Sequence, residues 1–233
     1  MASIATGDLE TLAQWDTPTI CNGLELLDAR YRTAGFTTQN MVCLDPKLKP
    51  MVGFARTATI RALAPADGDA RAVRALRARY YEHIAEPPLP TIAILQDLDP
   101  DPGFGAFWGE VNTTIHQGLG CLGSVTNGSF RDVDACAPGF QLLGGKVGPS
   151  HAWVHLVEIS CEVDVFGMIV KPNEIVHADR HGAVVVPADC VKRLPAAIDV
   201  LTRREAVILS AARQPGFTVE ILEQAMSDSA EIH

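Results

Sequence analysis

Two short apolar runs and the stretch between them constrain the fold of this 233-residue chain most strongly. Thr91–Leu98 and Leu122–Thr126 have the length and composition of buried strands, and Trp108–Gln117 between them is expected to form a helix. A strand, a helix and a second strand in this order predict a parallel crossover unit. The chain is therefore expected to be an α/β protein whose sheet contains parallel strands.

The remaining elements fit a single domain. Further helices are expected at Gly7–Trp15, from Thr17 after an N-cap at Asp16, at Asp69–Ala85, at Ala188–Arg213 and at Thr218–Met226. The helix at Asp69–Ala85 is amphipathic, with an apolar face formed by Val73, Leu76, Tyr80 and Ile84. Further strands are expected at Gly53–Ile60, Phe140–Leu143, Val157–Ser160, Val163–Val170, Ile175–Ala178 and Ala183–Val186. No internal repeat, low-complexity tract or long linker separates these elements, so one domain over residues 1–233 is predicted.

Composition excludes several classes of function. The formal net charge of −9 opposes binding to a nucleic-acid backbone, which needs clustered Lys and Arg. The sequence holds no apolar run of the roughly 18 residues that a membrane span requires. Its first residues lack the basic start and apolar stretch of a signal peptide, so a cytoplasmic protein is expected. The six cysteines are scattered without a CxxC pair and are expected to be free thiols.

The adjacent pair Arg131–Asp132 is the sharpest candidate site. It follows the Gly-rich stretch 118–130, in the region where ligands collect beyond the carboxyl ends of parallel strands. Arg131 offers a guanidinium for a carboxylate or keto oxygen, and Asp132 offers a ligand for a hard divalent cation. The alternative is an ordinary surface ion pair or a helix N-cap at Asp132.

A second Gly-rich stretch, 103–112, precedes the helix of the crossover unit. Free amide groups at a helix N-terminus bind anions, so the amides of Gly109 to Asn112 are expected to hold a carboxylate. Glu110 adds an acid near the same strand ends. An ordinary Gly-rich turn is the alternative, but this loop and Arg131–Asp132 close the same pair of strands, which predicts one crevice between them.

Four histidines form two pairs at i, i+4 spacing, His151 with His155 and His177 with His181. Both pairs lie near expected strands, and neither carries the glutamate of a zinc HExxH motif. Partly buried, hydrogen-bonded histidines are therefore favoured over metal or substrate ligands. Trp108 and Trp153 are expected in the core or in a pocket wall.

At Gly120–Asp132 the sequence GCLGSVTNGSFRD resembles the GxxGxVxxGxxRD segment of RraA-like proteins and class II 4-hydroxy-4-methyl-2-oxoglutarate aldolases. Asp16–Ile20, Gly53–Ile60 and Val170–Pro187 resemble further segments of that family, in the same order along the chain. The resemblance implies a swivelling β/β/α-type sandwich, assembled as a homotrimer or a dimer of trimers, with its site near a subunit interface.

The resemblance also implies roles for individual residues. Asp132 matches the aspartate that ligates Mg²⁺ or Mn²⁺, and Arg131 matches the arginine that contacts the keto-acid end of the substrate. Gly109, Glu110, Val111 and Asn112 match a loop that gives backbone amides to the substrate. The acid at Glu110 would order a water on the metal, and that water is the candidate proton shuttle. Glu205 is the candidate for a further acid supplied by a neighbouring subunit.

The expected function is a divalent-metal-dependent lyase that cleaves a C–C bond of a 2-oxoacid, as a pyruvate-forming aldolase, an oxaloacetate decarboxylase or both. The alternative is a non-catalytic RraA-type regulator that binds an RNA-degrading enzyme. A methyltransferase is disfavoured, because no nucleotide-type glycine fingerprint follows the first strand. The chain departs from the family pattern at Asn22–Gly23, at Asn173–Glu174 and in the segment 149–155, PSHAWVH.

Overall fold

The computed structural model describes residues 4–233, so the domain predicted over 1–233 begins with three residues outside the described part. The strands of the main sheet are β1 (Val42–Cys43), β2 (Met51–Arg61), β3 (Thr91–Asp97), β5 (Cys121–Thr126), β7 (Gln141–Gly144), β9 (His155–Ile159), β12 (Ile175–Asp179) and β13 (Gly182–Val186). The smaller strands are β4 (Ala106–Trp108), β6 (Ser129–Phe130), β8 (Lys146–Val147), β10 (Val163–Val165) and β11 (Met168–Val170). The helices are α1 (Thr6–Leu12), α2 (Thr17–Leu27), α3 (Ala70–Ala85), α4 (Glu110–Gly118), α5 (Leu194–Ala212) and α6 (Val219–Ala230), with a 3-10 turn at Ala29–Arg32.

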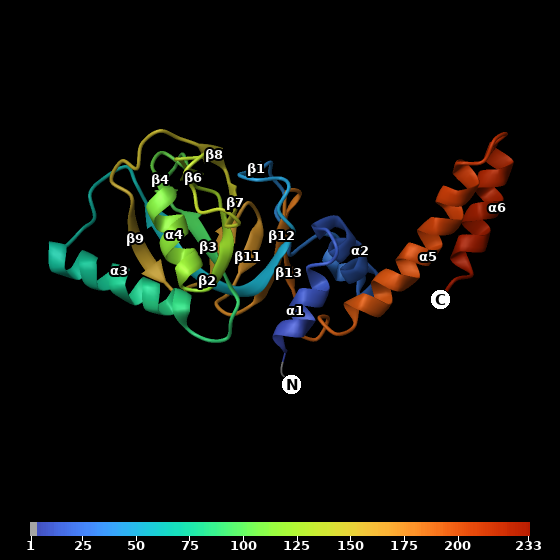
Figure 1. Ribbon diagram of the computed structural model, residues 1–233, viewed down its shortest axis with the longest axis horizontal. Coiled ribbons are helices and arrows are strands. Elements are labelled where there is room, and N and C mark those ends of the chain that lie inside the picture. The colour runs from blue at the N-terminus through green and yellow to red at the C-terminus, as the bar shows by residue number, and fades with distance from the viewer. Residues whose placement is uncertain (1–3) are drawn as a thin grey trace.

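The fold is a mixed α/β architecture around the main sheet, whose strand order is β1-β7-β5-β3-β2-β12-β13 (Figure 1). The predicted crossover unit is confirmed, because β3 and β5 run parallel in this sheet and α4 connects them. Strands β2 and β7 extend the parallel part on either side. At Gly123 a Cβ atom would lie 2.0 Å from the carbonyl oxygen of Gln141, so only glycine lets β5 and β7 approach this closely.

Strand β2 is long and bends around the body of the protein. Its first residues, Met51–Phe54, pair with β12, and its last residues, 58–61, pair with β9, with a register shift between Thr59 and Ile60. Both partners run antiparallel to β2, and β3 pairs with its other edge. A bulge of this kind increases strand twist, and here it carries the end of β2 towards β9 and α3.

Helices α2 and α3 each begin directly after an aspartate that caps them. The Asp16 carboxylate accepts a hydrogen bond from the Thr19 amide at 3.0 Å and caps α2, as predicted. Asp69 caps α3 in the same way, at 2.7 Å from the Ala72 amide. The Asp69 cap fixes where α3 begins, and therefore which side chains of α3 face the sheet.

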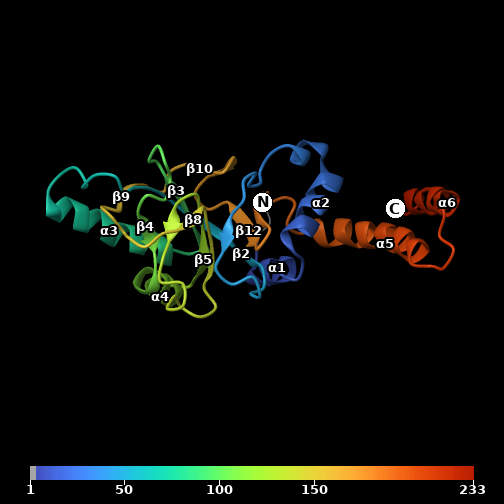
Figure 2. The same cartoon turned by 90° about the horizontal axis from the view of Figure 1, so that it is seen from above.

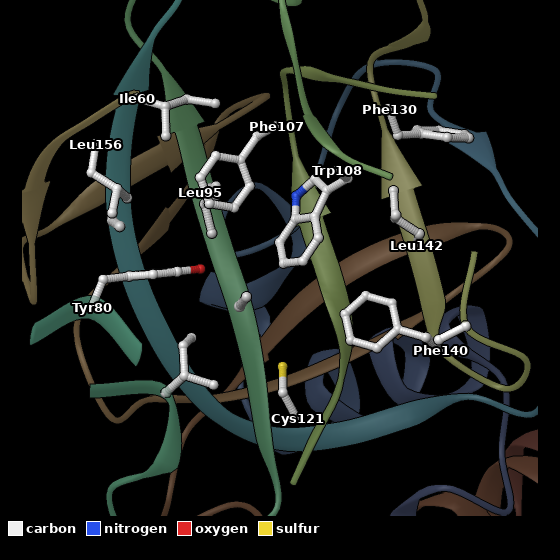
Figure 3. Close-up of a cluster of buried hydrophobic side chains, with 14 residues drawn as sticks. Ile60, Tyr80, Leu95, Phe107, Trp108, Cys121, Phe130, Phe140, Leu142 and Leu156 are labelled. Atoms are coloured by element: carbon white, nitrogen blue, oxygen red, sulfur yellow. The ribbon is translucent and has the colours of Figure 1, made fainter. Parts of the chain in front are cut away.

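A cluster of aromatic and aliphatic side chains joins α3, α4 and the sheet. Figure 3 shows Trp108 between Phe107 and Phe140, with ring centroids 5.2 and 5.5 Å away. Tyr80, predicted on the apolar face of its helix, is fully buried in the same cluster. Trp108 therefore lies in the core, one of its two predicted locations.

The last two helices extend away from the sheet (Figures 1 and 2). The buried residues of α5 all lie in its first part, at Leu194, Ala197 and Ile198, where the helix packs against α2. Beyond this point α5 packs mainly against α6, which folds back along it. The pair forms a C-terminal arm, residues 199–233, that leaves the body of the protein.

Several predicted boundaries need correction. The helix expected from Trp108 begins at Glu110, because Trp108 belongs to β4 and pairs with β6. The strand expected at Val163–Val170 is a hairpin, since Phe166 and Gly167 have φ values of 54° and 86° and reverse the chain. The closing helix expected from Ala188 begins at Leu194, after a series of turns.

Two other predictions concern the chain as a whole. All six cysteines carry free thiols, as expected. None of the helices within residues 4–233 is both long and apolar enough to cross a membrane.

Candidate active site

The pair Arg131–Asp132 directly follows β6, rather than the longer strand β5 that precedes it. The Arg131 amide donates to the Trp108 carbonyl at 3.0 Å, which joins the end of β6 to the end of β4, two residues before α4. Asp132 has a φ of 54°, in the left-handed region that Asp and Asn occupy more readily than other non-glycine residues. Its carbonyl accepts hydrogen bonds from the amides of Ala135 and Cys136, at 2.8 and 2.9 Å, and these stabilise the turn.

The N-terminus of α4 meets the Asp132 carboxylate. The Glu110 amide donates to Asp132 Oδ2 at 3.3 Å. The Asp132 carboxylate therefore caps α4, because the N-cap residue Gly109 has no side chain that could accept this hydrogen bond. A Cβ atom at position 109 would lie 2.5 Å from the same oxygen. Glycine at this position is therefore required for the loop and the carboxylate to approach each other.

The next two amides of this helix, those of Val111 and Asn112, have no hydrogen-bond partner within residues 4–233. The Asn112 side chain is held in place, since its Nδ2 donates to the Phe107 carbonyl at 2.5 Å and its Oδ1 accepts from the Tyr81 hydroxyl at 3.2 Å. The start of α4 thus presents free amides on a fixed support, as an anion site requires.

Arg131 and Asp132 form an open ion pair. Arg131 Nε lies 3.6 Å from Asp132 Oδ2, and the two side chains are 37% and 35% exposed. The other carboxylate oxygen, Oδ1, has no partner among the described residues. Both side chains therefore keep free polar atoms for a ligand, and this separates them from an ordinary closed surface pair.

The predicted convergence of the two loops is present, and it forms one end of a crevice of about 550 Å³. The residues of the site that line it are Gly109, Val111, Asn112, Arg131 and Asp132. Glu110 contributes its amide to Asp132, but its side chain is exposed and is not part of this wall.

The opposite wall comes from α3, which sequence reasoning treated only as a core helix. Val73, Arg77 and Tyr81 lie four residues apart on one stripe of the helix and line the crevice. Burial raises the pKa of the Tyr81 hydroxyl, and the Arg77 cation partly offsets this effect. The sequence places Arg77 and Tyr81 one position after the apolar-face residues Leu76 and Tyr80, at the border of that face.

The segment 149–155 forms the third side and contributes His151, Trp153 and His155. It is held by backbone hydrogen bonds, including Ala106 N to the Ser150 carbonyl at 2.9 Å and Trp153 N to the Ala62 carbonyl at 3.1 Å. Trp153 is 61% exposed and forms pocket wall, one of its two predicted locations.

The second histidine pair lies elsewhere and is hydrogen-bonded, as predicted. His177 is buried, with Nδ1 at 3.0 Å from the Thr17 hydroxyl and Nε2 at 3.0 Å from the Trp15 carbonyl. His181 Nδ1 lies 3.0 Å from Asp179 Oδ1. These contacts tie α2 to the end of β12 and explain the pair as structural.

The donor set at Asp132 is compatible with a hard divalent cation. No group of three or more His, Cys, Asp or Glu side chains that could hold a metal occurs in the described part of the chain. Mg²⁺ is commonly held by one or two carboxylates, with substrate oxygens and waters completing its shell. The unpartnered Oδ1 of Asp132 is compatible with this mode of binding.

Glu205, the candidate for a further acid, is exposed on α5. Figure 1 places the C-terminal arm at the opposite end of the molecule from α3. Glu205 therefore does not reach the crevice of its own chain.

The family model described as RraA-like, Aldolase/RraA, matches residues 17–185. The chain belongs to the RraA-like family. The expected RraA-like α/β sandwich is thereby confirmed as its fold, and residues 17–185 include all three sides of the crevice, with the Arg131–Asp132 pair.

Solved structures share the RraA-like fold at low sequence identity. An uncharacterized protein from Pseudomonas syringae pv. tomato str. DC3000 is 21% identical with a TM-score of 0.72, over 97% of this chain and 96% of that one. Streptomyces coelicolor RraAS2, described as an unusual member of the RNase ES inhibitor RraA family, is 19% identical with a TM-score of 0.67, over 92% and 100%. No curated protein matches the sequence significantly.

Proposed function

We propose that this RraA-like protein is a divalent-metal-dependent lyase that cleaves a C–C bond of a 2-oxoacid. The observation that carries the proposal is the placement of Arg131, Asp132 and the free amides of α4 at one end of a single crevice. A carboxylate, a guanidinium and a helix N-terminus together suit a small anion that develops charge on an adjacent oxygen.

Each residue at this end has a distinct task. The free amides of Val111 and Asn112 bind the substrate carboxylate, which aligns the 2-oxo group with Arg131. The Arg131 guanidinium donates hydrogen bonds to the 2-oxo oxygen and stabilises the negative charge that it gains as the enolate forms. Asp132 holds Arg131 on one side and keeps Oδ1 for the cation. When bound, the cation supplies Lewis-acid polarisation of the 2-oxo group.

The enolate of pyruvate is the shared product of two reactions. It forms when a 4-hydroxy-2-oxoacid undergoes retro-aldol cleavage and when oxaloacetate loses carbon dioxide. A site that stabilises this enolate supports both reactions, so both substrates belong in the test.

Pyruvate release is the decisive assay. We expect release from oxaloacetate and from 4-hydroxy-4-methyl-2-oxoglutarate in the presence of Mg²⁺ or Mn²⁺, loss of at least nine-tenths of the rate on adding EDTA, and recovery when Mg²⁺ is restored in excess. A coupled lactate dehydrogenase assay follows the product, with a heat-denatured sample as the control for spontaneous decay. Absence of pyruvate release above that control with either cation would reject the lyase and favour the non-catalytic regulator.

A further inference from the structure

The crevice contains few groups that could exchange a proton with a substrate. Its titratable side chains within the described residues are Arg77, Tyr81, Arg131, Asp132, His151 and His155. The guanidinium groups stay protonated, and burial raises the pKa of the Tyr81 hydroxyl, which donates to Asn112. The Asp132 carboxylate is bound to Arg131 and to the Glu110 amide. The two imidazoles are the remaining candidates.

Hydrogen bonds to the backbone fix the tautomer of both rings. His155 Nδ1 lies 2.8 Å from the Trp153 carbonyl, and His151 Nδ1 lies 2.7 Å from the Ala152 carbonyl. A carbonyl oxygen only accepts, so Nδ1 carries the hydrogen in each case. In the neutral ring Nε2 then carries the lone pair, and imidazole is the side chain that exchanges a proton between pH 5 and 8.

His155 is the better supported of the two. It begins β9, is partly buried and pairs with Arg61 of β2 across the sheet. His151 is exposed and belongs to a turn whose next residue, Ala152, has a φ of 45°. A side chain on a strand is held in one direction more firmly than one on a turn.

Resting on the proposed lyase function, we propose that His155 Nε2 is the proton acceptor for retro-aldol cleavage. The 4-hydroxyl O–H bond breaks and its proton moves to Nε2. The C3–C4 bond breaks, a carbonyl forms at C4, and the electron pair enters the pyruvate enolate beside Arg131. Nε2 then returns the proton to C3, which gives pyruvate and leaves His155 neutral. Atoms and charge balance without a further reactant.

This assignment separates the two reactions that the enolate site supports. Oxaloacetate decarboxylation starts from a carboxylate that is already deprotonated, so the C–C bond breaks without a base. His155 is therefore needed for aldol cleavage and not for decarboxylation.

Other charged groups surround His155 and enter any pH profile. Its cross-strand neighbour Arg61 lies 3.7 Å from Asp99. The groups that share the crevice with it are Arg77, Tyr81, Arg131, Asp132 and His151. Decarboxylation in the same crevice is subject to the same neighbours, so the difference between the two pH profiles isolates the proton acceptor.

Two substitutions test the proposal with the whole chain. His155→Asn keeps an amide nitrogen near the Nδ1 position, so the hydrogen bond to Trp153 survives while Nε2 is lost; His155→Gln keeps an amide near the Nε2 position. We expect both to lower kcat/KM for 4-hydroxy-4-methyl-2-oxoglutarate at least a hundredfold and to leave oxaloacetate decarboxylation within about threefold. Pyruvate affinity, measured by calorimetry with Mg²⁺, should stay within about threefold in both variants.

The wild-type pH profile gives an independent readout. The profile of kcat/KM for cleavage should show an acid limb, where the proton acceptor is already occupied, and the profile for decarboxylation should lack this limb. His151→Gln provides the comparison, because His151 is exposed on a turn, and cleavage should survive in it.

The outcomes separate the two proposals. A wild-type protein that releases pyruvate from neither substrate rejects the lyase function itself. If wild type decarboxylates oxaloacetate but does not cleave the aldol substrate, the proton-acceptor role of His155 is overturned and the lyase stands. The role is also overturned if the His155 variants lose both reactions equally or neither, or if cleavage depends on His151 instead.

Discussion

Replacing Asp132 by asparagine is expected to lower kcat for pyruvate release by about a thousandfold with both substrates. Asparagine has nearly the same shape, tolerates the φ of 54° at this position and still accepts the Glu110 amide. What the variant loses is the negative charge that would bind the cation at Oδ1 and that places Oδ2 3.6 Å from Arg131 Nε. The effect is therefore one of chemistry rather than of fold.

Two measurements make this test decisive. The thermal midpoint of Asp132→Asn should stay within a few degrees of wild type, because its backbone turn and helix cap are retained. Titration with Mn²⁺, followed by electron paramagnetic resonance, should show loss of the site. An Asp132→Asn protein that keeps Mn²⁺ binding and activity would contradict the assignment of Asp132.

Gly109→Ala tests the Asp132 carboxylate indirectly, by placing a methyl group against it from the loop before α4. The added methyl group would lie 2.5 Å from Asp132 Oδ2 and 3.3 Å from Arg131 Cγ, so the loop or the ion pair must move. We expect kcat/KM for pyruvate release to fall about a hundredfold, since small displacements of positioning groups have effects of this size.

The matched control lies on the same helix. Gly118, at the other end of α4, has no atom within 4 Å of an added Cβ, so Gly118→Ala should keep full activity. Equal rates for the two alanine variants would show that the close approach at Gly109 does not matter for activity.

The second large effect concerns stability against acid. His116 is buried in α4, with Nδ1 at 2.6 Å from the Asn112 carbonyl and Nε2 at 2.9 Å from the Tyr80 hydroxyl. Burial lowers the pKa of His116 from 6.5 to about 4. The unfolded chain therefore takes up this proton first as the pH falls, and the free energy of unfolding should decrease by about 3 kcal/mol between pH 6.5 and 4.

Urea unfolding at a series of pH values measures this loss. His177 is also buried with a lowered pKa and adds to the slope in the same direction, so the comparison must be with His116→Gln, which cannot take up the proton. The loss between pH 7 and 4 should be smaller in the variant by about 3 kcal/mol. If His116→Gln is too unstable at low pH, NMR titration of the wild-type ring serves instead; a midpoint near 6.5 would refute the prediction.

Sequence periodicity was sufficient for the larger elements of the fold. The crossover unit, the capped start of α2 and the amphipathic face of α3 were predicted because each depends on local spacing and on residues with strong positional preferences. The strands β4, β6 and β8 were missed because two or three residues carry no measurable alternation. The helix start at Glu110 was misplaced for the same reason, since Trp108 pairs with β6 through its backbone.

The site could be predicted in part. The two loops were expected to meet because parallel strands end at the same edge of a sheet, and they do meet at Gly109 and Asp132. The walls from α3 and from the segment 149–155 could not be predicted in this way. Their positions depend on how β2 bends towards β9, which is a property of tertiary packing rather than of any local pattern.

The C-terminal arm has a consequence for how the protein opens. Past Ile198, α5 packs mainly against α6, so the arm separates from the body at the cost of few buried contacts. Amide protons of the arm should therefore exchange with solvent through local opening, whereas those of β2 and β3 should exchange only when the whole sheet unfolds. The protein then has two levels of cooperativity, and the crevice belongs to the more stable one.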